Sequence, residues 1–593
     1  MNLFILLPFI PMLGGILTLI YHFKKQNTNL ITNVFMGISL ILSIILVFNR
    51  VNTNETYNFL ELNGAHLKIS FCIDNLSVIM LLMINFISFI IHRYSTNYLS
   101  SDITQGRFMA QLSILTSSVS VLVISGNLLT AFIAWQFIGL SLYILLNHYH
   151  YDIFANKAAK KKFIINRLGD VSFLLAVILC YKFFGSSDFN CTTNSHHYIN
   201  VLGVISCNIN TVIALLVFIA VMTKSAQFPF HIWLPDTMEA PTPVSAIMHA
   251  GVINAGGFLL TRIHSMINLS MFASNVIYTI GILTILTAAF FILTQSDVKK
   301  QLAYSTMGQM GYMVVECSLG FYSAAIFHLI AHGFFKAFLF LSSGNNIGQI
   351  NNNIESLRAN FRAKISKIVF FLSLYFIIFH YINIDINNSL LLIGAFILVS
   401  ILNLYFDLET IINLNYIKKM IIGITIMFVF IIYFILSLKL SKFIGFEETI
   451  NNNHMFNLYK LVILLSIVLI QLVIWINVNL MPQKITLVIY HLSRNKFFIE
   501  DFYRWSIINP FRRLGIYLNK LFLKSHLKII STIIIVSITC TCIFKIEAFN
   551  IKIILFIIQV LFLLYIITAN KASNIRGLLN SELLQIYCLK ISS

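Results

Sequence analysis

The chain has 593 residues, 58% of them hydrophobic and only 10% charged, and its mean hydropathy is +0.86. So few charges cannot cover the surface of a soluble protein of this size, and the sequence therefore predicts a polytopic integral membrane protein. The net charge of +19 lies in loops such as residues 24–26, 157–162 and 362–367, with no basic domain to gather it, which argues against a nucleic-acid partner. Basic loops instead favour the negatively charged side of a membrane.

Apolar segments follow one another along the whole chain. At about 20 residues for each membrane span, they predict about 17 transmembrane helices. The candidates are residues 2–21, 30–48, 69–91, 109–125, 128–148, 163–184, 211–223, 244–262, 274–294, 302–318, 322–342, 366–382, 389–406, 420–438, 458–478, 527–545 and 551–569. The first candidate follows the initial methionine directly, so we expect no cleavable signal or transit peptide.

The first hundred residues offer little specific chemistry. A polar loop is expected at 50–66, and His92, Arg93 and Tyr94 at the end of the third span are expected to anchor it at the membrane interface. The eight cysteines of the chain are scattered, and their single C-x-C pair lacks the further ligands that a zinc or iron–sulfur site needs. Glycine-rich nucleotide motifs are absent as well, so the sequence predicts a chain with no cofactor and no redox centre of its own.

Residues 222–264 form a polar joint between apolar segments. Lys224 ends the apolar run 211–222, and a charge at membrane depth is costly unless it faces a cavity or a partner. Pro229 and Pro235 cannot continue a helix, and a broken helix inside a membrane is tolerated only where it is buried in protein or lines water. The pattern indicates an ion pathway, although Lys224 could also snorkel from a helix end to the headgroups.

The joint contains KSAQFPFHIWLPDTMEAPTPVSAIMHA, which resembles the signature of the antiporter-like membrane subunits of respiratory complex I, shared with multi-subunit cation/proton antiporters of the Mrp type. The resemblance covers roughly residues 100–345 well. Residues 495–511, NKFFIEDFYRWSIINPF, resemble the segment that leads into the C-terminal extension of the family's largest subunit. Four more stretches agree with the family, namely FIAWQFIGLSLYILL at 132–146, NRLGDVSFLLA at 166–176, QSDVKKQLAYSTMGQMGYM at 295–313 and IFHLIAHGFFKAFLFL at 326–341.

The resemblance implies an all-α fold of about 16 transmembrane helices with two inverted five-helix repeats, each containing a broken helix. A lateral amphipathic helix and an anchoring helix would follow, although two further spans would fit the apolar runs nearly as well. The implied divisions are N-terminal helices at 1–105, a first repeat at 106–265, a second repeat at 266–440 that is degenerate after 345, C-terminal helices at 441–570 and a polar tail at 571–593.

The resemblance also implies a function. The chain would be a proton-translocating subunit of H⁺-translocating NADH:ubiquinone reductase, with FMN, iron–sulfur clusters and ubiquinone held by partner subunits. Its partners would be other membrane-arm subunits, and lipids such as cardiolipin could bind as well. We expect the mitochondrial inner membrane, or the plasma membrane if the chain is bacterial. Rival interpretations are a stand-alone Mrp-type antiporter and a scaffold that has kept the fold but lost pumping.

In the first half of the family pattern, a glutamate follows the tryptophan at Trp135 and pairs with the first lysine, here Lys224. This chain has Gln136 instead, so the first half lacks its expected acid. Arg167 and Asp170 lie three residues apart and share a helix face, either as a structural ion pair or as part of the pathway. Glu316 is an unexplained acid whose partner the sequence does not identify.

The resemblance implies that His249 links the two halves. In the second half, His328, His332 and Lys336 are spaced i, i+4 and i+8, which predicts one polar stripe on an otherwise apolar helix. The two histidines could also ligate a metal, although the lysine one turn further on would oppose it. The resemblance also implies an exit for protons on the far side of the membrane, formed by a lysine motif. That motif is absent here, and Asp407 is the nearest candidate to replace it.

Overall fold

The computed structural model describes residues 3–23, 29–49, 52–62, 65–189, 198–201, 205–292, 294–343, 483–510 and 513–517, with seven single residues between 432 and 444. The chain divides into two compact units, one of residues 1–59 with 66–500 and one of residues 60–65 with 501–593. The spans predicted after residue 345, the exit candidate Asp407 and the polar tail lie outside the described residues.

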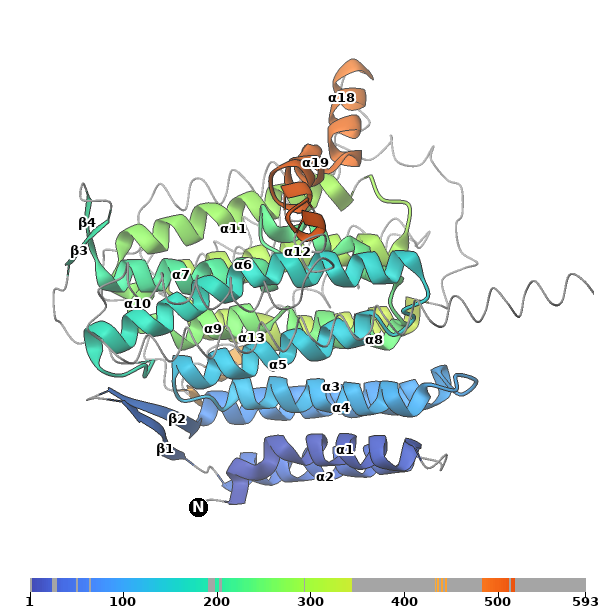
Figure 1. Cartoon of the computed structure of the whole chain (residues 1–593), viewed down its shortest axis with the longest axis vertical. Helices are drawn as coiled ribbons and strands as arrows, with labels where there is room; N and C mark the ends of the chain where they lie inside the picture. Colours follow the sequence, from blue (N-terminus) through green and yellow to red (C-terminus); the bar gives the residue numbers. More distant parts are fainter. Residues whose placement is uncertain are drawn as a thin grey trace, which may run out of the picture. The chain divides into compact units, whose positions relative to one another are not determined.

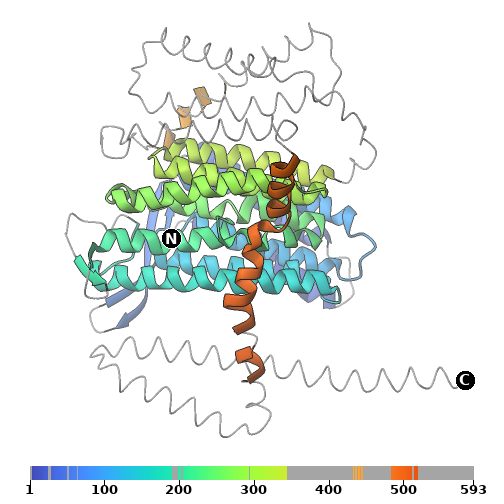
Figure 2. The ribbon, with the colours of Figure 1, turned by 90° about the horizontal axis from the view of Figure 1, so that it is seen from above.

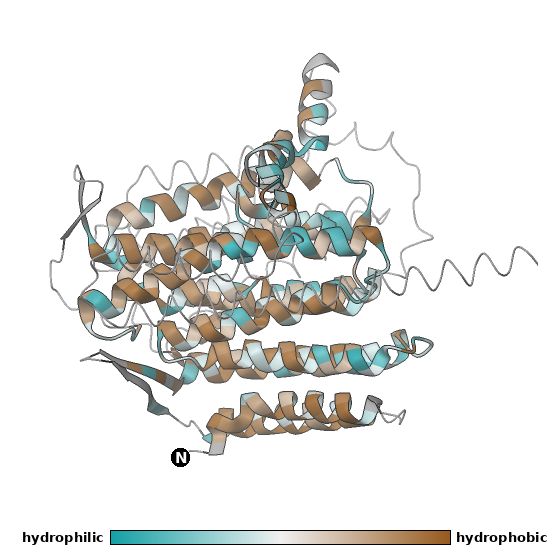
Figure 3. Ribbon diagram, in the orientation of Figure 1, coloured by the Kyte–Doolittle hydropathy of each residue, from teal (hydrophilic) through white to brown (hydrophobic). Residues whose placement is uncertain are grey.

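The first unit is built from helices that run alongside one another (Figures 1 and 2). Among the described residues, nine segments are long and apolar enough to cross a membrane. Figure 3 shows apolar residues along these helices, with hydrophilic residues gathered mainly near their ends. The helices are α1 (Ile10–Phe23, after a 3₁₀ turn at Leu3–Phe9), α2 (Asn29–Asn49), α3 (Asn75–Tyr98), α4 (Gln105–Val123), α5 (Leu128–Leu146), α6 (Ile153–Phe184), α7 (Ile209–Lys224), α8 (Thr242–Ile247), α9 (Ala255–Arg262), α10 (His264–Asn268), α11 (Met271–Ile292), α12 (Val298–Ser318) and α13 (Tyr322–Ser342).

The predicted spans up to residue 342 all lie mainly on helices, but two of them, on α7 and α12, are not among the nine segments long and apolar enough to cross a membrane. The fold is also not purely helical. Strands β1 (Thr53–Leu62) and β2 (Ala65–Ile73) form a hairpin where a polar loop and the start of the third span were expected. The reason is visible in β2, where apolar and polar residues alternate from Ala65 to Phe71 with the period of two that a strand requires. Strands β3 (Tyr198–Val201) and β4 (Ile205–Asn208) form a second antiparallel pair.

Side-chain caps decide where several helices begin. The Asp74 carboxylate accepts from the backbone N–H of Ser77 at 2.8 Å, and the Ser77 hydroxyl accepts from the backbone N–H of Asp74, so that α3 starts at Asn75. Asp152 caps α6 in a similar way, and Gly185, with φ +69°, ends the same helix in the left-handed conformation that glycine adopts without strain. Helix α6 is therefore ten residues longer at its start than hydropathy predicts.

The prediction that His92 anchors the third span at the interface is wrong. His92 is fully buried in α3, and its ring hydrogen-bonds the backbone carbonyl of Ser88 at 2.7 Å and the hydroxyl of Ser113 in α4 at 3.0 Å. A polar side chain removed from water needs such partners, and the two serines supply them. Arg93 is exposed, as an interface residue should be.

The two ends of the helix bundle differ in their number of basic side chains. The lysine-rich end is where α3 and α5 end and α6, α8 and α12 begin, and it is tied together by contacts such as Thr242 with Tyr98. The hairpin end is where α3 and α5 begin and α9 ends, beside β2. Described basic side chains at the lysine-rich end include Arg93, Arg107, Lys157, Lys160, Lys161, Lys299 and Lys300, whereas the hairpin end carries Lys68, Lys182 and Arg262.

Residues 483–508 form a series of short helices and turns. Helix α18 covers Gln483–Arg494, a 3₁₀ turn covers Lys496–Phe498, α19 covers Ile499–Tyr503, and a π-helical turn covers Arg504–Ile508. Of these, α18 and the 3₁₀ turn belong to the first unit, while the π-helical turn belongs to the second.

Candidate functional site

The break that the prolines predict separates α7 from α8. After Lys224 the chain passes through two 3₁₀ turns, Phe230–Trp233 and Pro235–Glu239, before α8 begins. Lys224 does not snorkel to the surface, because only 2% of it is exposed. Its Nζ donates to the backbone carbonyl of Trp135 in α5 at 2.9 Å and lies 4.1 Å from the centre of the Trp135 ring. The ring face and the carbonyl together hold the cation.

Gln136 belongs to a second contact beside this lysine. Its side-chain oxygen accepts a hydrogen bond from Arg167 Nη1 at 3.0 Å, while Arg167 Nη2 lies 2.7 Å from the Asp170 carboxylate. The prediction that Arg167 and Asp170 share a helix face is confirmed. Asp170 is buried, whereas 41% of the Arg167 side chain is exposed. The glutamine therefore contributes a neutral acceptor to Arg167 where a carboxylate would have competed with Asp170.

Lys162 is a buried cation that the sequence analysis did not single out. Only 1% of it is exposed, and it lies one helical turn before Asn166 and two turns before Asp170 on α6. With its amide oxygen facing Lys162, Asn166 accepts from Nζ at 3.2 Å and donates to the backbone carbonyl of Thr223 at 3.3 Å. The i, i+4, i+8 spacing was the available signal, but the basic run 157–162 reads as a loop.

His249 lies in a π-helical turn, Met248–Val252, between α8 and α9. Such turns occur often at functional sites because they displace one side chain from the regular helical position. The ring is fully buried and stacks on Phe340 of α13 with centroids 4.5 Å apart. Neither ring nitrogen has a hydrogen-bond partner in the described part of the chain. The Ser225 hydroxyl donates to the Ile253 carbonyl at 2.6 Å and so joins the end of α7 to this segment.

The polar stripe on α13 faces the interior, as its spacing predicts. Lys336 is 1% exposed and His332 is 5% exposed, while the side chain of His328 is 15% exposed. Lys336 Nζ donates to the Ser305 hydroxyl of α12 at 2.9 Å and to the Leu302 carbonyl at 3.3 Å. The rings of His328 and His332 have centroids 6.4 Å apart. Lys336, His332 and His249 also lie within electrostatic reach of one another.

Close packing brings α13 to His249. A methyl group added at Gly333 would lie 3.1 Å from the Ala250 carbonyl and 2.0 Å from the end of the flexible Met83 side chain, so the glycine permits a close approach of the helices. Gly333 follows His332 directly, and Ala250 follows His249. The two histidines are thus placed by one small residue at the crossing of their helices.

Glu316 is the acid partner of the stripe. Its two carboxylate oxygens lie 3.1 and 3.3 Å from His328 Nδ1, and His328 Nε2 lies 2.8 Å from the side-chain oxygen of Gln309. Glu316 therefore faces the second half of the site, and the open question of its partner is answered. Among the described residues, no three His, Cys, Asp or Glu side chains gather as metal ligands would.

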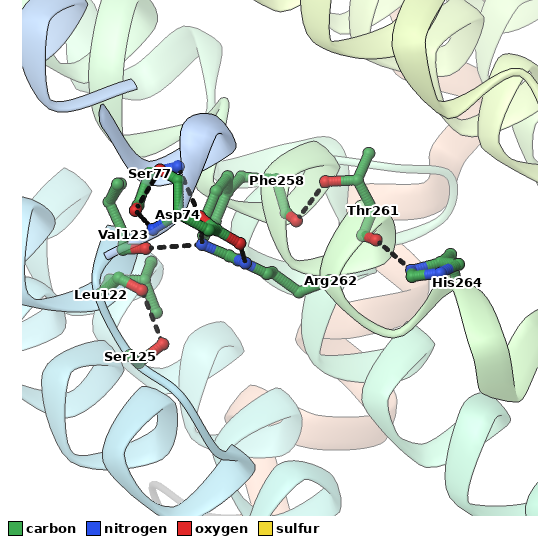
Figure 4. A network of polar contacts seen from close by, with 9 residues as sticks. All are labelled: Asp74, Ser77, Leu122, Val123, Ser125, Phe258, Thr261, Arg262 and His264. Carbon is green, nitrogen blue, oxygen red and sulfur yellow. Dashed lines mark hydrogen bonds and ion pairs between the residues drawn. The ribbon is translucent and has the colours of Figure 1, made fainter. Parts of the chain in front are cut away.

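At the hairpin end, an ion pair closes the contact between α3 and α9 (Figure 4). Arg262 Nη2 donates to the Asp74 carboxylate at 2.9 Å and to the Val123 carbonyl at 3.2 Å. Burial by itself would raise the pKa of Asp74, but Arg262 and the Ser77 contacts lower it below its ordinary value. A cavity of about 430 Å³ adjoins the pair, and its polar lining includes Asp188 and His264.

At the lysine-rich end, four charged residues join α6, the broken segment and the 3₁₀ turn after α18. Lys161 Nζ lies 2.7 Å from Asp236 and 2.7 Å from Glu500, and Lys496 Nζ lies 3.5 Å and 3.2 Å from the same two acids. Burial opposes the charge on Glu500, but the two lysines lower its pKa to about 2. The two acids likewise raise the pKa of Lys496 against the effect of burial.

This four-residue charge cluster holds an unusual backbone. Lys496, Phe497 and the residue after them have φ values of 52°, 52° and 54°, in the left-handed region. For residues with a Cβ that conformation costs about 1 kcal/mol each, so the turn needs compensating contacts. The ion pairs of Lys496 supply one, and Phe497 packs on Phe291 of α11 with ring centroids 5.3 Å apart.

Two models of known protein families match segments of this chain. Residues 125–386 match the family described as NADH:quinone oxidoreductase/Mrp antiporter membrane subunits, and residues 59–109 match the N-terminal region of complex I chain 5. Together the two matches place the resemblance to antiporter-like membrane proteins within residues 59–386.

Particular relatives narrow the resemblance. NADH-ubiquinone oxidoreductase chain 5 of Metridium senile is 38% identical over 355 residues, which are 58% of this chain and 58% of the relative. A probable inorganic carbon transporter subunit, DabB1 of Halothiobacillus neapolitanus, is 38% identical over 348 residues, 58% of this chain and 62% of the relative. The match thus spans about six tenths of each relative's length.

A solved structure shares the fold. The Mrp complex from Dietzia sp. DQ12-45-1b aligns with a TM-score of 0.60 at 17% sequence identity, over 91% of this chain and 62% of that chain. At this identity the likeness concerns the fold alone. The chain is thus a multi-pass helical membrane protein with the architecture of antiporter-like subunits.

Proposed function

We propose that the chain translocates protons as an antiporter-like subunit of respiratory complex I. The observation that carries the proposal is the burial of Lys224 and Lys336 inside the helix bundle, with His249 and His332 buried near Lys336. A helix that only packs in a membrane has no need of buried lysines and imidazoles, which are costly there. Imidazole nitrogens that lack protein partners require water, and water joined to titratable side chains conducts protons.

The proposed path runs through two connected halves. The first contains Lys224, Gln136, Arg167 and Asp170, and the second contains the α13 stripe with Glu316. His249 would connect them, because it lies within electrostatic reach of Lys336 and the segment after it is hydrogen-bonded through Ile253 to Ser225 at the end of α7. Electron transfer would occur in partner subunits that hold FMN, iron–sulfur clusters and ubiquinone, and this chain would respond to it through neighbouring membrane-arm subunits.

The charge asymmetry supports an orientation. Basic residues in short loops favour the negatively charged side of an energised membrane, so the lysine-rich end would face that side and the hairpin end the positive side. For a mitochondrial chain these sides are the matrix and the intermembrane space. The proposal includes a location in the mitochondrial inner membrane, with the bacterial plasma membrane as the alternative. It also includes cardiolipin binding, a total of 16 helices, two inverted repeats and an exit near Asp407.

Two rival functions need a direct test. A stand-alone Mrp-type antiporter or a non-pumping scaffold would have the same fold, and the relative named as a carbon transporter subunit shows that the family includes other complexes. Gently solubilised membranes separated on a native gel distinguish them. We expect this chain to migrate with NADH-oxidising activity. Isolation as a single chain that exchanges cations for protons in liposomes would contradict the proposal.

A further inference from the structure

Two buried ammonium groups lie near each other in the first half of the site. Lys162 on α6 and Lys224 at the end of α7 are 1% and 2% exposed, and Lys224 lies within electrostatic reach of Lys162. Asn166 joins their surroundings, since it contacts Lys162 Nζ on one side and the Thr223 carbonyl, next to Lys224, on the other. Helices α6 and α7 pack closely here because Gly169 has no side chain. A methyl group at that position would lie 2.0 Å from the Thr223 hydroxyl.

The charges around the two lysines do not balance. Among the described residues, Asp170 is the carboxylate within electrostatic reach of both amines, and Arg167 already pairs with it at 2.7 Å. Gln136 adds no charge, and Lys161, the neighbour of Lys162 in the sequence, is occupied by Asp236 and Glu500 in the charge cluster. Two like charges in a buried site with one shared acid, itself already paired, repel each other and lack hydration. The site therefore favours one proton on the pair over two.

We propose that Lys162 is a second proton-carrying residue of the first half, which exchanges a single excess proton with Lys224. In the transfer, an N–H bond of one ammonium breaks, the proton passes through hydrogen-bonded water, and an N–H bond forms on the other amine. Each lysine is then charged in turn, and the charge of the site is unchanged. The amide of Asn166 positions Lys162 for this exchange. This inference rests on the proposed proton-translocating function and adds a residue to it.

A purely structural role for Lys162 makes different predictions. If Lys162 only tied α6 together through Asn166, an arginine would preserve the charge and the hydrogen bond. Arginine cannot release its proton in a protein, whereas histidine can. Substitutions at this position therefore separate a fixed charge from an exchangeable proton.

The experiment measures protons pumped per NADH oxidised in the assembled complex for Lys162→Arg, Lys162→Met and Lys162→His. We expect Arg and Met to lose most of the pumping and His to retain a clear part of it. Lys160→Met is the matched control, because Lys160 is exposed two residues away on the same helix, and it should pump normally. If Lys162→Arg fails to assemble, the comparison of Met with His decides the question.

Two outcomes would overturn the inference. Normal pumping by Lys162→Met, or full pumping by Lys162→Arg with loss in Lys162→His, would leave Lys162 as a structural residue. In the same preparation, Lys336→Ala separates this failure from failure of the proposed function. If Lys336→Ala abolishes pumping while Lys162→Met does not, the function stands and only the role of Lys162 is rejected.

Discussion

Lys224 contacts Trp135 in two ways, because its Nζ lies over the face of the indole ring and also donates to the Trp135 backbone carbonyl. Such a site holds an ammonium group by a quadrupole and a dipole, without direct contact to a carboxylate in the described residues. The family pattern would place an acid next to that tryptophan. Here Gln136 accepts from Arg167 instead, so the contacts of Lys224 in the first half are weaker than an ion pair would be.

The first half can be tested at those two positions. We expect Lys224→Ala to lower the number of protons pumped per NADH oxidised, because it removes a titratable group of the path. We expect Gln136→Glu to change the same ratio, since a new carboxylate would compete with Asp170 for Arg167 and attract the charge on Lys224. Pumping that is unaltered in both variants would show that the first half is not a proton path.

The second half makes a stronger prediction. Lys336→Ala should largely abolish proton pumping and slow coupled NADH oxidation while the complex still assembles, because the stripe would lose its terminal proton carrier. The matched control is Lys300→Ala, since that lysine is 34% exposed and approaches its acids only to 4.0 Å. An assembled Lys336→Ala complex with normal pumping stoichiometry would refute the stripe as a proton path.

Glu316 should matter through its charge. We expect Glu316→Gln to slow pumping, because the amide can still accept a hydrogen bond from His328 but no longer stabilises a positive charge on the stripe. Proton uptake into vesicles during NADH oxidation would measure the effect. Asp297→Asn provides the control, since Asp297 is 48% exposed and an asparagine can also cap α12. Equal rates for both variants would remove Glu316 from the mechanism.

The ion pair at the hairpin end should contribute to stability. We expect Arg262→Ala to lower the free energy of unfolding by about 2 kcal/mol, because Asp74 loses charge-assisted hydrogen bonds in a partly buried place. The midpoint of thermal denaturation in detergent would report the loss. Arg93→Ala, on the exposed side of α3, should leave the midpoint unchanged. Similar midpoints for the two variants would contradict this role of Arg262.

The charge cluster predicts a window of pH. Because the pKa of Glu500 falls to about 2 in the folded chain, its contribution is present above its ordinary pKa of about 4.3 and is lost as the pH falls toward the folded value. The pKa of Lys496 is raised, so its contribution is present below about 10.4 and is lost only at higher pH. The attachment of residues 496–500 should thus be constant between about pH 5 and pH 10.

Hydrogen exchange at the amides of residues 496–503 measures this attachment after correction for intrinsic rates. Glu500→Gln should speed exchange across the window, whereas Asp501→Asn should not, because Asp501 is 64% exposed and pairs only with Arg504 among the described residues. A steep rise in exchange near pH 6 in the unaltered chain would contradict the assigned ion pairs.

Hydropathy and periodicity predict a large part of this architecture for physical reasons. A membrane span needs about 20 apolar residues, so most of the helices up to residue 342 are visible from composition alone. Pro229 and Pro235 predict the break because they cannot continue a helix. The stripe of His328, His332 and Lys336 follows from the helical repeat, since these residues belong to one helix.

What the sequence does not predict are contacts between elements. Spacing on α13 says nothing of Glu316, which reaches His328 from α12. Lys162 was missed because Asp152 caps α6 earlier than hydropathy indicates, so a buried helical residue looked like part of a basic loop. His92 likewise resembles an interface residue in the sequence, because its hydrogen bond to Ser113 of the next helix cannot be predicted from spacing.

The charge cluster also implies an order of assembly during synthesis. Lys161 and Asp236 are 75 residues apart and can pair while much of the chain is still being made, but Glu500 lies 339 residues beyond Lys161. In a nascent chain halted before residue 496, Lys161 of α6 and Asp236 of the broken segment would therefore be paired with each other, and each would lack its second partner. These second partners, Glu500 and Lys496, are synthesised late. Lys161 and Asp236 thus form a binding site for residues 496–500 before those residues are made.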